Sequence, residues 1–194
     1  SDDPKSRRKG IKLLGWRGYK KALDTIEPLL KDKDPMVRIT TAITLAKMKR
    51  LSVKLAKPLS EGLGISDRSL QSICRRWLEA LGEKALPALK DAASSSNDET
   101  VSQALILLEK IPDKETSKIL KNLMSHKNRN IKNEAMVLLA KHEGATEEMA
   151  PLLIAYAVKD ERRAGAIGGL LSTLGNSSLP LLAKAFENPD YKVR

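Results

Sequence analysis

The 194-residue chain is poor in aromatic residues, cysteine and long apolar runs. It holds two tryptophans, three tyrosines and one phenylalanine, so aliphatic side chains must fill most of any core. The single cysteine, Cys74, cannot form an internal disulfide and fits a reducing compartment, from which we expect a cytoplasmic protein. Because no apolar run approaches about 18 residues, we expect no membrane insertion.

The sequence also lacks the motifs of common catalytic and metal sites. His126 lies in a polar segment and His142 precedes Glu143, but neither is accompanied by a second histidine or a Cys-x-x-Cys pair that could complete a zinc or iron site. The sequence has no phosphate-binding loop, dinucleotide motif or nucleophile elbow. We therefore expect a non-enzymatic protein with no metal and no cofactor.

An internal repeat is the main positive feature of the chain. Prolines recur at intervals of roughly 30 residues or twice that, each followed closely by a leucine, and a second series of mostly acidic positions follows about half a unit later. The prolines are Pro28, Pro58, Pro87, Pro151 and Pro180, and the second series is Asp3, Asp34, Asp67, Asp98, Asn130, Asp160 and Asp190. Two registers with one period predict a solenoid built from two-element units.

Each unit is predicted to contain two helices. Apolar residues recur three and four positions apart, as in Leu23, Ile26 and Leu30, and no alternating strand pattern competes. Asp34 followed by Pro35 supplies a capping oxygen and then a proline in the first turn, which starts a helix. The recurrent prolines fall inside the first helix of each unit, where we expect them to bend the helix axis.

The predicted helices cover almost the whole chain. A lone helix over residues 3–14 is followed by helix pairs at 19–48, 51–81, 83–110, 113–142 and 146–174 and by a final first helix at 177–187. This pattern predicts an all-α solenoid of about six helix-pair repeats with a period of roughly 31 residues, forming a single domain over residues 1–194. Both ends fall within a repeat and lack polar capping repeats, so we expect a fragment of a longer chain.

The segment 31–38 (KDKDPMVR), together with Ala42 and Leu45, resembles the HEAT repeat in its short variant named for phycobilisome lyases. Similar segments lie at both ends of the chain, and the resemblance implies a right-handed α-solenoid whose second helices form the concave face. It also implies that Arg38 bonds an aspartate of an adjoining turn, so that a ladder of such pairs ties the units together. It does not fix the function, because such repeats serve as scaffolds, transport receptors, bilin lyase subunits, hydroxylases and DNA glycosylases.

Positive charge is concentrated at the N-terminal end of the chain. Residues 1–50 carry 14 lysines and arginines against 6 aspartates and glutamates, which gives them +8 of the net charge of +11. Lysine and arginine neutralise phosphates and exposed aromatic rings stack on bases, so this segment is a candidate nucleic-acid site. The candidate phosphate-binding residues are Lys5, Arg7, Arg8, Lys9, Trp16, Arg17, Tyr19, Lys20 and Lys21. The competing interpretation is a solvated face in which Trp16 and Tyr19 fill a joint between repeats.

A second basic series falls on the predicted second helices and the turns before them. Its candidate partner-binding residues are Arg68, Arg75, Arg76, Arg129, Lys132, Arg162 and Arg163. On a concave face they would form a strip, interrupted near Asp98 and Glu99, that suits an acidic protein. The competing interpretation is that they pair with the chain's own carboxylates, such as Glu79, Glu134 and Glu161, in exposed ion pairs that contribute little.

Two further features concern packing. Cys74 lies beside Arg75 near the apolar stripe of a predicted helix, and we expect it to be a buried packing residue rather than a reactive thiol. Gly165, Gly168 and Gly169 lie within another predicted helix, where glycine is unfavourable, so we expect something to pack closely on them. The neighbouring unit is the favoured candidate, and a ligand or partner backbone is the alternative.

These features favour a protein-protein interaction scaffold that binds a partner along the concave face. The alternative is a nucleic-acid-binding HEAT-like module that uses the basic N-terminal third. A bilin lyase subunit, the third class, rests on the repeat variant alone.

Overall fold

Helices are the only regular secondary structure in the part of the chain that the structure describes. The computed structural model describes residues 2–16, 22–159, 161–180 and 183. The predicted all-α solenoid is confirmed, whereas its right-handed sense and its number of repeats stay predictions. Contacts divide the chain into two compact units, residues 1–111 and 112–194. The single domain predicted for residues 1–194 is not tested by this division.

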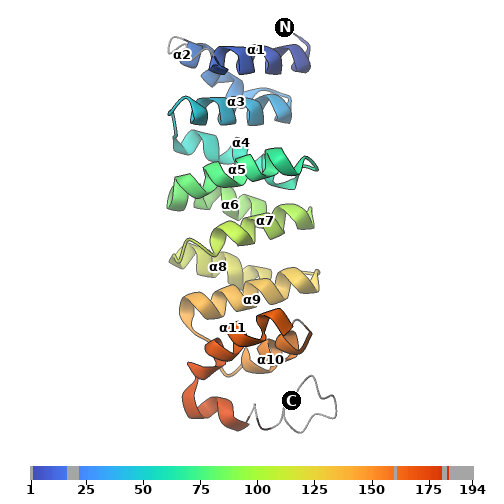
Figure 1. Cartoon of the computed structure of the whole chain (residues 1–194), viewed down its shortest axis with the longest axis vertical. Helices are drawn as coiled ribbons and strands as arrows, with labels where there is room; N and C mark the ends of the chain where they lie inside the picture. The colour runs from blue at the N-terminus through green and yellow to red at the C-terminus, as the bar shows by residue number, and fades with distance from the viewer. Residues whose placement is uncertain (1, 17–21, 160, 181–182, 184–194) are drawn as a thin grey trace. The chain divides into compact units, whose positions relative to one another are not determined.

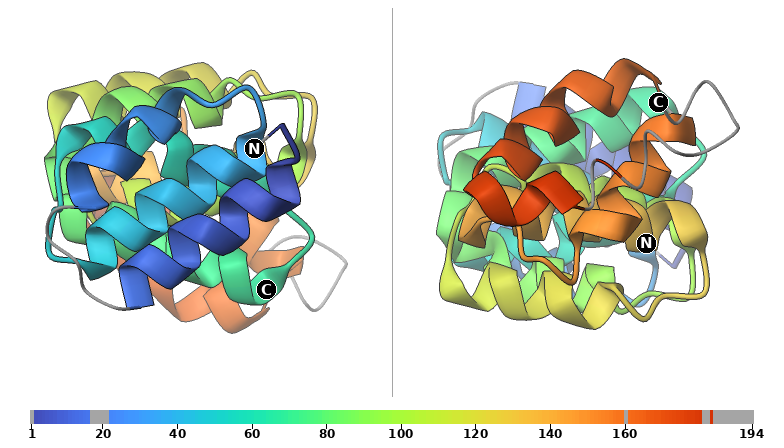
Figure 2. Two further views of the ribbon diagram at one scale, coloured as in Figure 1. Left: turned by 90° about the horizontal axis from the view of Figure 1, so that it is seen from above. Right: turned by 90° about the horizontal axis from the view of Figure 1, so that it is seen from below.

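Unit 1, residues 1–111, is a double layer of helices (Figure 1). Its elements, with η denoting a 3₁₀ helix, are α1 (Pro4–Trp16), α2 (Ala22–Ile26), η1 (Glu27–Lys31), α3 (Pro35–Lys47), η2 (Val53–Leu55), α4 (Ala56–Glu61), η3 (Gly62–Gly64), α5 (Arg68–Leu81), η4 (Gly82–Ala85), α6 (Leu86–Ala93) and α7 (Asp98–Leu108). The second helices of the repeats, α1, α3, α5 and α7, stack in one layer, and α2 with η1, α4 and α6 form the first-helix layer. Figure 2 shows α1 and α3 side by side with nearly parallel axes. We call the solvent-facing surface of the second-helix layer the second-helix face.

Unit 2, residues 112–194, repeats the same plan. Its elements are α8 (Lys114–Leu123), α9 (Arg129–Glu143), α10 (Ala150–Lys159), α11 (Glu161–Ser172) and η5 (Gly175–Ser178). Helix α9 packs against α8, α10 and α11, and α10 packs against α11. Met136, Leu153 and Ile167 are among the buried residues that join these helices in one apolar core.

Polar side chains start the second helices, as the sequence predicts. The carboxylate of Asp34 accepts a hydrogen bond of 2.9 Å from the backbone N–H of Val37. In two later repeats the capping residue precedes the predicted one, because Asn97 caps α7 and Asn128 caps α9. An N-cap must hold an extended backbone just before the first turn, and both asparagines do so.

The recurrent prolines change the type of helix rather than bending one continuous α-helix. At Pro28 the chain has just passed from α2 into η1, and Pro58 and Pro87 follow directly on passages from 3₁₀ into α-helix. Pro151 lies in the first turn of α10. A proline cannot donate to the preceding turn, so the helix changes its hydrogen bonding at this point or begins there. The predicted bent first helices are therefore corrected to short helices of mixed type.

Aliphatic residues fill the core of unit 1, as expected from the shortage of aromatic ones. Leu45, Leu59 and Leu78 are among the fully buried side chains. Cys74 is also fully buried, and burial raises the pKa of its thiol to about 12. The prediction of an unreactive packing cysteine is thus confirmed. Gly62 permits this packing, because a β-carbon there would overlap with the Cys74 sulfur.

The glycines of α11 do not pack against described residues. Gly165, Gly168 and Gly169 are exposed, and a β-carbon added to any of them would have no described atom within 4 Å. The expectation that a neighbouring unit approaches them closely is therefore wrong for the described residues. Their alternative role, contact with a ligand or partner, stays a prediction.

Candidate functional site

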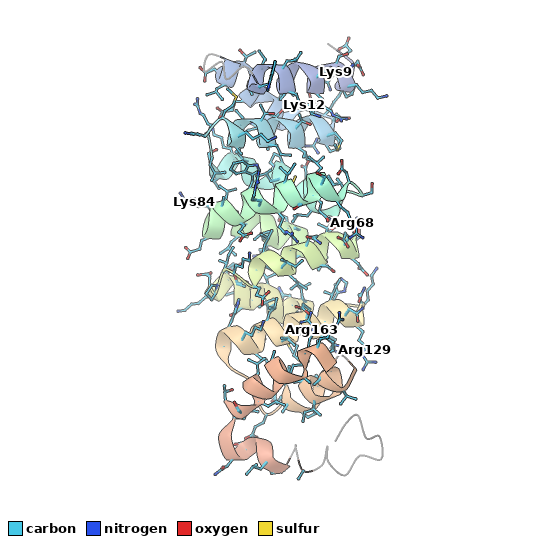
Figure 3. All side chains as sticks on the ribbon, viewed as in Figure 1. Lys9, Lys12, Arg68, Lys84, Arg129 and Arg163 are labelled. Carbon is cyan, nitrogen blue, oxygen red and sulfur yellow. The ribbon has the colours of Figure 1, made fainter. Side chains whose placement is uncertain are left out.

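The second-helix face of unit 1 carries a groove that crosses three helices. It has a volume of about 680 Å³ and is lined by residues of α1 and α3 and by the start of α5. We call it the second-helix groove. Figure 3 shows the side chains around it and labels Lys12 on α1 and Arg68 at the start of α5.

The floor of the second-helix groove is mainly apolar. Met36, Thr40 and Ile43 follow one another at helical spacing along the outer side of α3 and line the groove. The hydroxyl of Thr40 donates a hydrogen bond of 2.6 Å to the Met36 carbonyl, so it is already satisfied within the helix. Helix α5 adds Leu70 and Ile73, which are both half-buried. The floor therefore offers aliphatic surface with few unmet hydrogen-bonding groups.

A glycine shapes one end of the groove by letting α1 approach α3. A β-carbon on Gly15 would overlap with the Cγ2 of Thr44, so the two helices could not be this close with a larger residue. The next residue, Trp16, is 82% exposed and also lines the groove. A large aromatic side chain thus stands in solvent beside an apolar floor, which is unusual for a purely structural residue.

Three cations line the second-helix groove and have no carboxylate partner among the described residues of unit 1. Arg8, Lys12 and Lys47 form no ion pair and no side-chain hydrogen bond within the described residues. The Nε of Arg8 is buried and has no described hydrogen-bond partner. Among the lining residues the one carboxylate is Asp67, which accepts a hydrogen bond of 3.0 Å from the backbone N–H of Leu70 as the N-cap of α5. The groove is therefore positively charged.

A second groove lies on the first-helix layer, between η1 and α4, and as many carboxylates as cations line it. We call it the first-helix groove; it has a volume of about 1010 Å³. The Nζ of Lys54 lies 2.8 Å from a carboxylate oxygen of Glu27, and this hydrogen bond lowers the pKa of Glu27. Arg38 binds Glu61 across the same groove, with 2.9 Å between Nε and Oε2. Its volume is larger, but carboxylates bind two of its four cations, Arg38 and Lys54.

Arginines tie successive repeats together through the turns between helices. Arg7, the fourth residue of α1, donates two hydrogen bonds of 2.8 Å to the carboxylate of Asp32, and they lower the pKa of that carboxyl group. Arg38, the fourth residue of α3, donates to Glu61 and to the Asp32 carbonyl. The ladder expected at Arg38 exists, but its carboxylate partner is Glu61 rather than an aspartate such as Asp34, which caps α3.

The ladder continues in α5 with an amide in place of the arginine. Gln71, the fourth residue of α5, donates to the Leu63 carbonyl at 2.7 Å and to the carboxylate of Glu99 at 3.0 Å. An arginine is therefore not required at this position. The role of Glu99 also explains why the predicted basic strip is interrupted here, since this carboxylate serves the contact between repeats.

The structure separates the candidate phosphate-binding residues. Arg7 is engaged in the ladder, which weighs against a role in phosphate binding. Lys5 and Lys9 are exposed on α1, whereas Arg8 and Trp16 line the second-helix groove. The candidates outside the described residues are Arg17, Tyr19, Lys20 and Lys21.

In unit 1, the candidate strip residues lie on α5. Arg68 is exposed at its first position, as Figure 3 shows. Arg75 donates a long hydrogen bond of 3.4 Å to Gln103, and the guanidinium of Arg76 lies 5.4 Å from the centre of the Trp77 ring. Two of the three are thus in contact with side chains of unit 1.

In unit 2, the strip residues lie on α9 and α11. Arg129 and Arg162 are exposed, and Lys132 is half-buried. Arg163 lies 2.8 Å from Glu134, so the competing interpretation, pairing with the chain's own carboxylates, holds for this residue. A role of the strip in binding a partner stays a prediction.

The sequence prediction of the site missed Lys12, Lys47 and the apolar floor. A pattern that could have indicated the groove lies on the outer side of α3, where Met36, Ile43 and Lys47 fall at helical spacing on one face. The buried stripe of the same helix is more apolar and dominated the pattern. Only the side-by-side packing of α1 and α3 shows that these residues join Arg8 in one groove.

The described residues hold no constellation for metal chemistry. No group of three or more histidines, cysteines, aspartates and glutamates among them is arranged to hold a metal ion. The Nδ1 of His126 accepts a hydrogen bond of 3.0 Å from the backbone N–H of Asn128, which assigns it to a turn. Across the described ranges, every helix is too short or too polar to span a membrane.

Comparison with known proteins agrees with this architecture. The family model of HEAT repeats matches residues 1–82, which contain helices α1 to α5 and hence the whole second-helix groove. No curated protein matches the chain. The narrower resemblance to the phycobilisome-lyase type stays a prediction. Residues 1–82 are therefore similar to the HEAT repeats of this family.

Proposed function

We propose that the protein is a non-enzymatic scaffold that binds a partner protein on its second-helix face. The supporting observation is the second-helix groove, which combines the exposed Trp16, an apolar floor and three cations without described partners. Exposed apolar surface that is rimmed by polar groups is typical of interaction sites. HEAT repeats commonly serve as scaffolds for protein interactions, which supports the same proposal.

A protein partner fits this groove better than a nucleic acid does. Phosphates need cations, whereas an apolar floor stabilises only a partner that brings apolar groups of its own. The basic N-terminal segment also offers less than its composition suggests, because Asp32 engages Arg7. Nucleic-acid binding is therefore the competing hypothesis, and nuclease treatment in the following experiment tests it.

Affinity capture from an extract of the native cell, with and without nuclease, tests the proposed function. We expect bound proteins to be retained after nuclease treatment. The double variant Trp16→Glu/Ile106→Glu should lose them, because it places charge on two exposed apolar residues of the second helices. The matched control Leu51→Glu/Val53→Glu changes two exposed apolar residues outside those helices and should retain them.

Two results would contradict the proposed function. Loss of all captured proteins after nuclease treatment would show that capture depends on nucleic acid, and would favour nucleic-acid binding by the basic N-terminal segment. Equal capture by the wild type and by both double variants would show that the second-helix face is not the binding surface. Circular dichroism of each variant ensures that only folded protein is compared.

The proposal includes a cytoplasmic location. Cys74 is the single cysteine of the chain and is buried as a free thiol. Proteins with free thiols and no disulfides are typical of reducing compartments. Fluorescence of a tagged copy in the native cell checks this assignment.

A further inference from the structure

We propose that the second-helix groove binds an acidic, amphipathic segment of the partner protein. In this arrangement, bulky apolar side chains of the segment enter the groove and its carboxylates bind the cations at the rim. This inference deepens the proposed function and rests on it, because it names the chemistry of the partner at the same surface.

The apolar part of the proposal follows from the floor. Ile43 is 7% exposed, and the half-buried Leu70 and Ile73 face it across the groove from α5. A volume of about 680 Å³ is within the range of roughly 300–1,000 Å³ that is common for ligand sites. Trp16 adds an exposed aromatic side chain, a residue type that often dominates the free energy of protein association. The groove is therefore suited to several apolar side chains of a partner.

The acidic part follows from the cations. Arg8, Lys12 and Lys47 approach the groove from two helices and have no described partner. Within the lining, Asp67 already serves as the N-cap of α5, so it does not neutralise them. The Nε of Arg8 is a buried donor that a carboxylate from outside would satisfy. Charge complementarity therefore selects a segment with several aspartates or glutamates.

The combination of both parts distinguishes a peptide from a polyphosphate chain. A phosphate backbone would use the cations and leave the aliphatic floor in contact with water. An acidic helix with leucines spaced three and four apart would use both at once, as amphipathic helices do in apolar grooves. The proposal commits to this occupant, and nucleic acid becomes an outcome of the test.

Fluorescence anisotropy with a labelled synthetic peptide tests the proposal. The probe has about 16 residues, with leucines at helical spacing and glutamates between them. One control peptide has serine in place of leucine, another has glutamine in place of glutamate, and a single-stranded DNA of equal length serves as a general polyanion. We expect the acidic leucine peptide to bind most tightly and to weaken as salt rises.

Charge-matched variants locate the site. Arg8→Gln/Lys12→Gln/Lys47→Gln should lower the affinity for the acidic leucine peptide about tenfold or more, because it removes all three rim cations. Lys31→Gln/Lys54→Gln/Lys57→Gln removes the same charge from the lining of the first-helix groove and should change it less than about twofold. Leu70→Ser/Ile73→Ser, which alters the floor without changing the charge, should weaken binding of the leucine peptide and leave the serine peptide unaffected.

Several outcomes would overturn the inference. They are equal affinity for the serine peptide or the DNA, equal loss in the two charge-matched triple variants, and no binding of the leucine peptide. If partner proteins are still captured through the second-helix face in any of these cases, the proposed function stands and only the acidic, amphipathic chemistry is wrong. If the peptide binds as expected but no protein is captured, the proposed function fails instead.

Discussion

The two grooves of unit 1 use the same residue types in opposite ways. In the first-helix groove, Lys54 binds Glu27 and Arg38 binds Glu61, so its charges hold the repeats together. In the second-helix groove, Arg8 and its neighbouring lysines have no described carboxylate partner. The smaller groove is thus the better site for an acidic ligand, because three cations line it with one carboxylate, whereas four carboxylates offset the four cations of the larger groove. Volume alone would have selected the other groove.

Two adjacent arginines differ in the same way: one binds a carboxylate of the chain and the other has no described partner. Arg7 points to the turn before α3 and binds Asp32, while Arg8 lines the second-helix groove. Successive residues of a helix are about 100° apart around its axis, so neighbours in sequence face different surroundings. A basic run on a helix therefore divides into structural and available cations.

The largest effect is expected in the apolar core of unit 1. Leu78 is fully buried in α5, and Leu78→Asp should lower the free energy of unfolding by more than about 4 kcal/mol, enough to unfold unit 1. Leu70→Asp on the same helix changes a half-buried groove residue and should leave the unit folded. Circular dichroism during thermal unfolding compares the two variants. An unchanged melting curve for Leu78→Asp would contradict the assigned packing.

A smaller effect is expected at the contact that shapes the second-helix groove. Gly15→Ala should lower the free energy of unfolding by about 1–3 kcal/mol, because the new methyl group collides with the branched side chain of Thr44. In a Thr44→Ser background, which lacks the colliding Cγ2, the same change should be neutral or slightly stabilising. Chemical denaturation of all four proteins gives the coupling. Additive effects would show that the two helices are not in close contact here.

The adjacent arginines should separate stability from binding. Arg7→Gln should lower the melting temperature, because it leaves Asp32, whose side chain is 8% exposed, without its partner. Arg8→Gln should hardly change the melting temperature, but it should lower the affinity for the acidic leucine peptide. Since Arg7 lowers the pKa of Asp32, the stabilising effect of the pair is present above the unfolded value of about 4 and is lost as pH falls below it.

Melting curves at several pH values check the direction of this pH dependence. The difference between the wild type and Arg7→Gln should be largest near neutral pH and should shrink as pH falls below about 4. A difference that is independent of pH would show that the arginine stabilises the fold through packing alone. Loss of peptide binding by folded Arg7→Gln would remove the distinction between the two arginines.

The smallest effect is expected at one of the accessible ion pairs of unit 2. Arg163 and Glu134 lie 2.8 Å apart, but the arginine side chain is 37% exposed and its partner is also accessible. Arg163→Gln should therefore change the free energy of unfolding by only about 0–1 kcal/mol. A loss well above this range, measured by chemical denaturation, would place the pair among the structural contacts with Arg7 and Arg38.

The sequence predicts the fold of this protein more closely than its site. Recurrent polar starts such as Asp34 predict helices because capping depends on a few neighbouring residues. The partner of Arg38 was not predictable, since Glu61 lies in the next repeat and several carboxylates compete for one arginine. The second-helix groove depends on the close approach of α1 and α3. Gly15 and Thr44 make this approach possible, but their contact joins two helices and is not visible in the sequence.

The buried thiol of Cys74 can be used to measure local opening of unit 1. It packs against Gly62 and is the single cysteine of the chain, so a thiol-reactive dye has one target in these 194 residues. With a pKa of about 12 in the folded state, the thiol reacts only when this region opens and the group returns to its ordinary acidity. The labelling rate therefore measures how often the helices under both grooves separate. A ligand that holds α1, α3 and α5 together should slow the labelling.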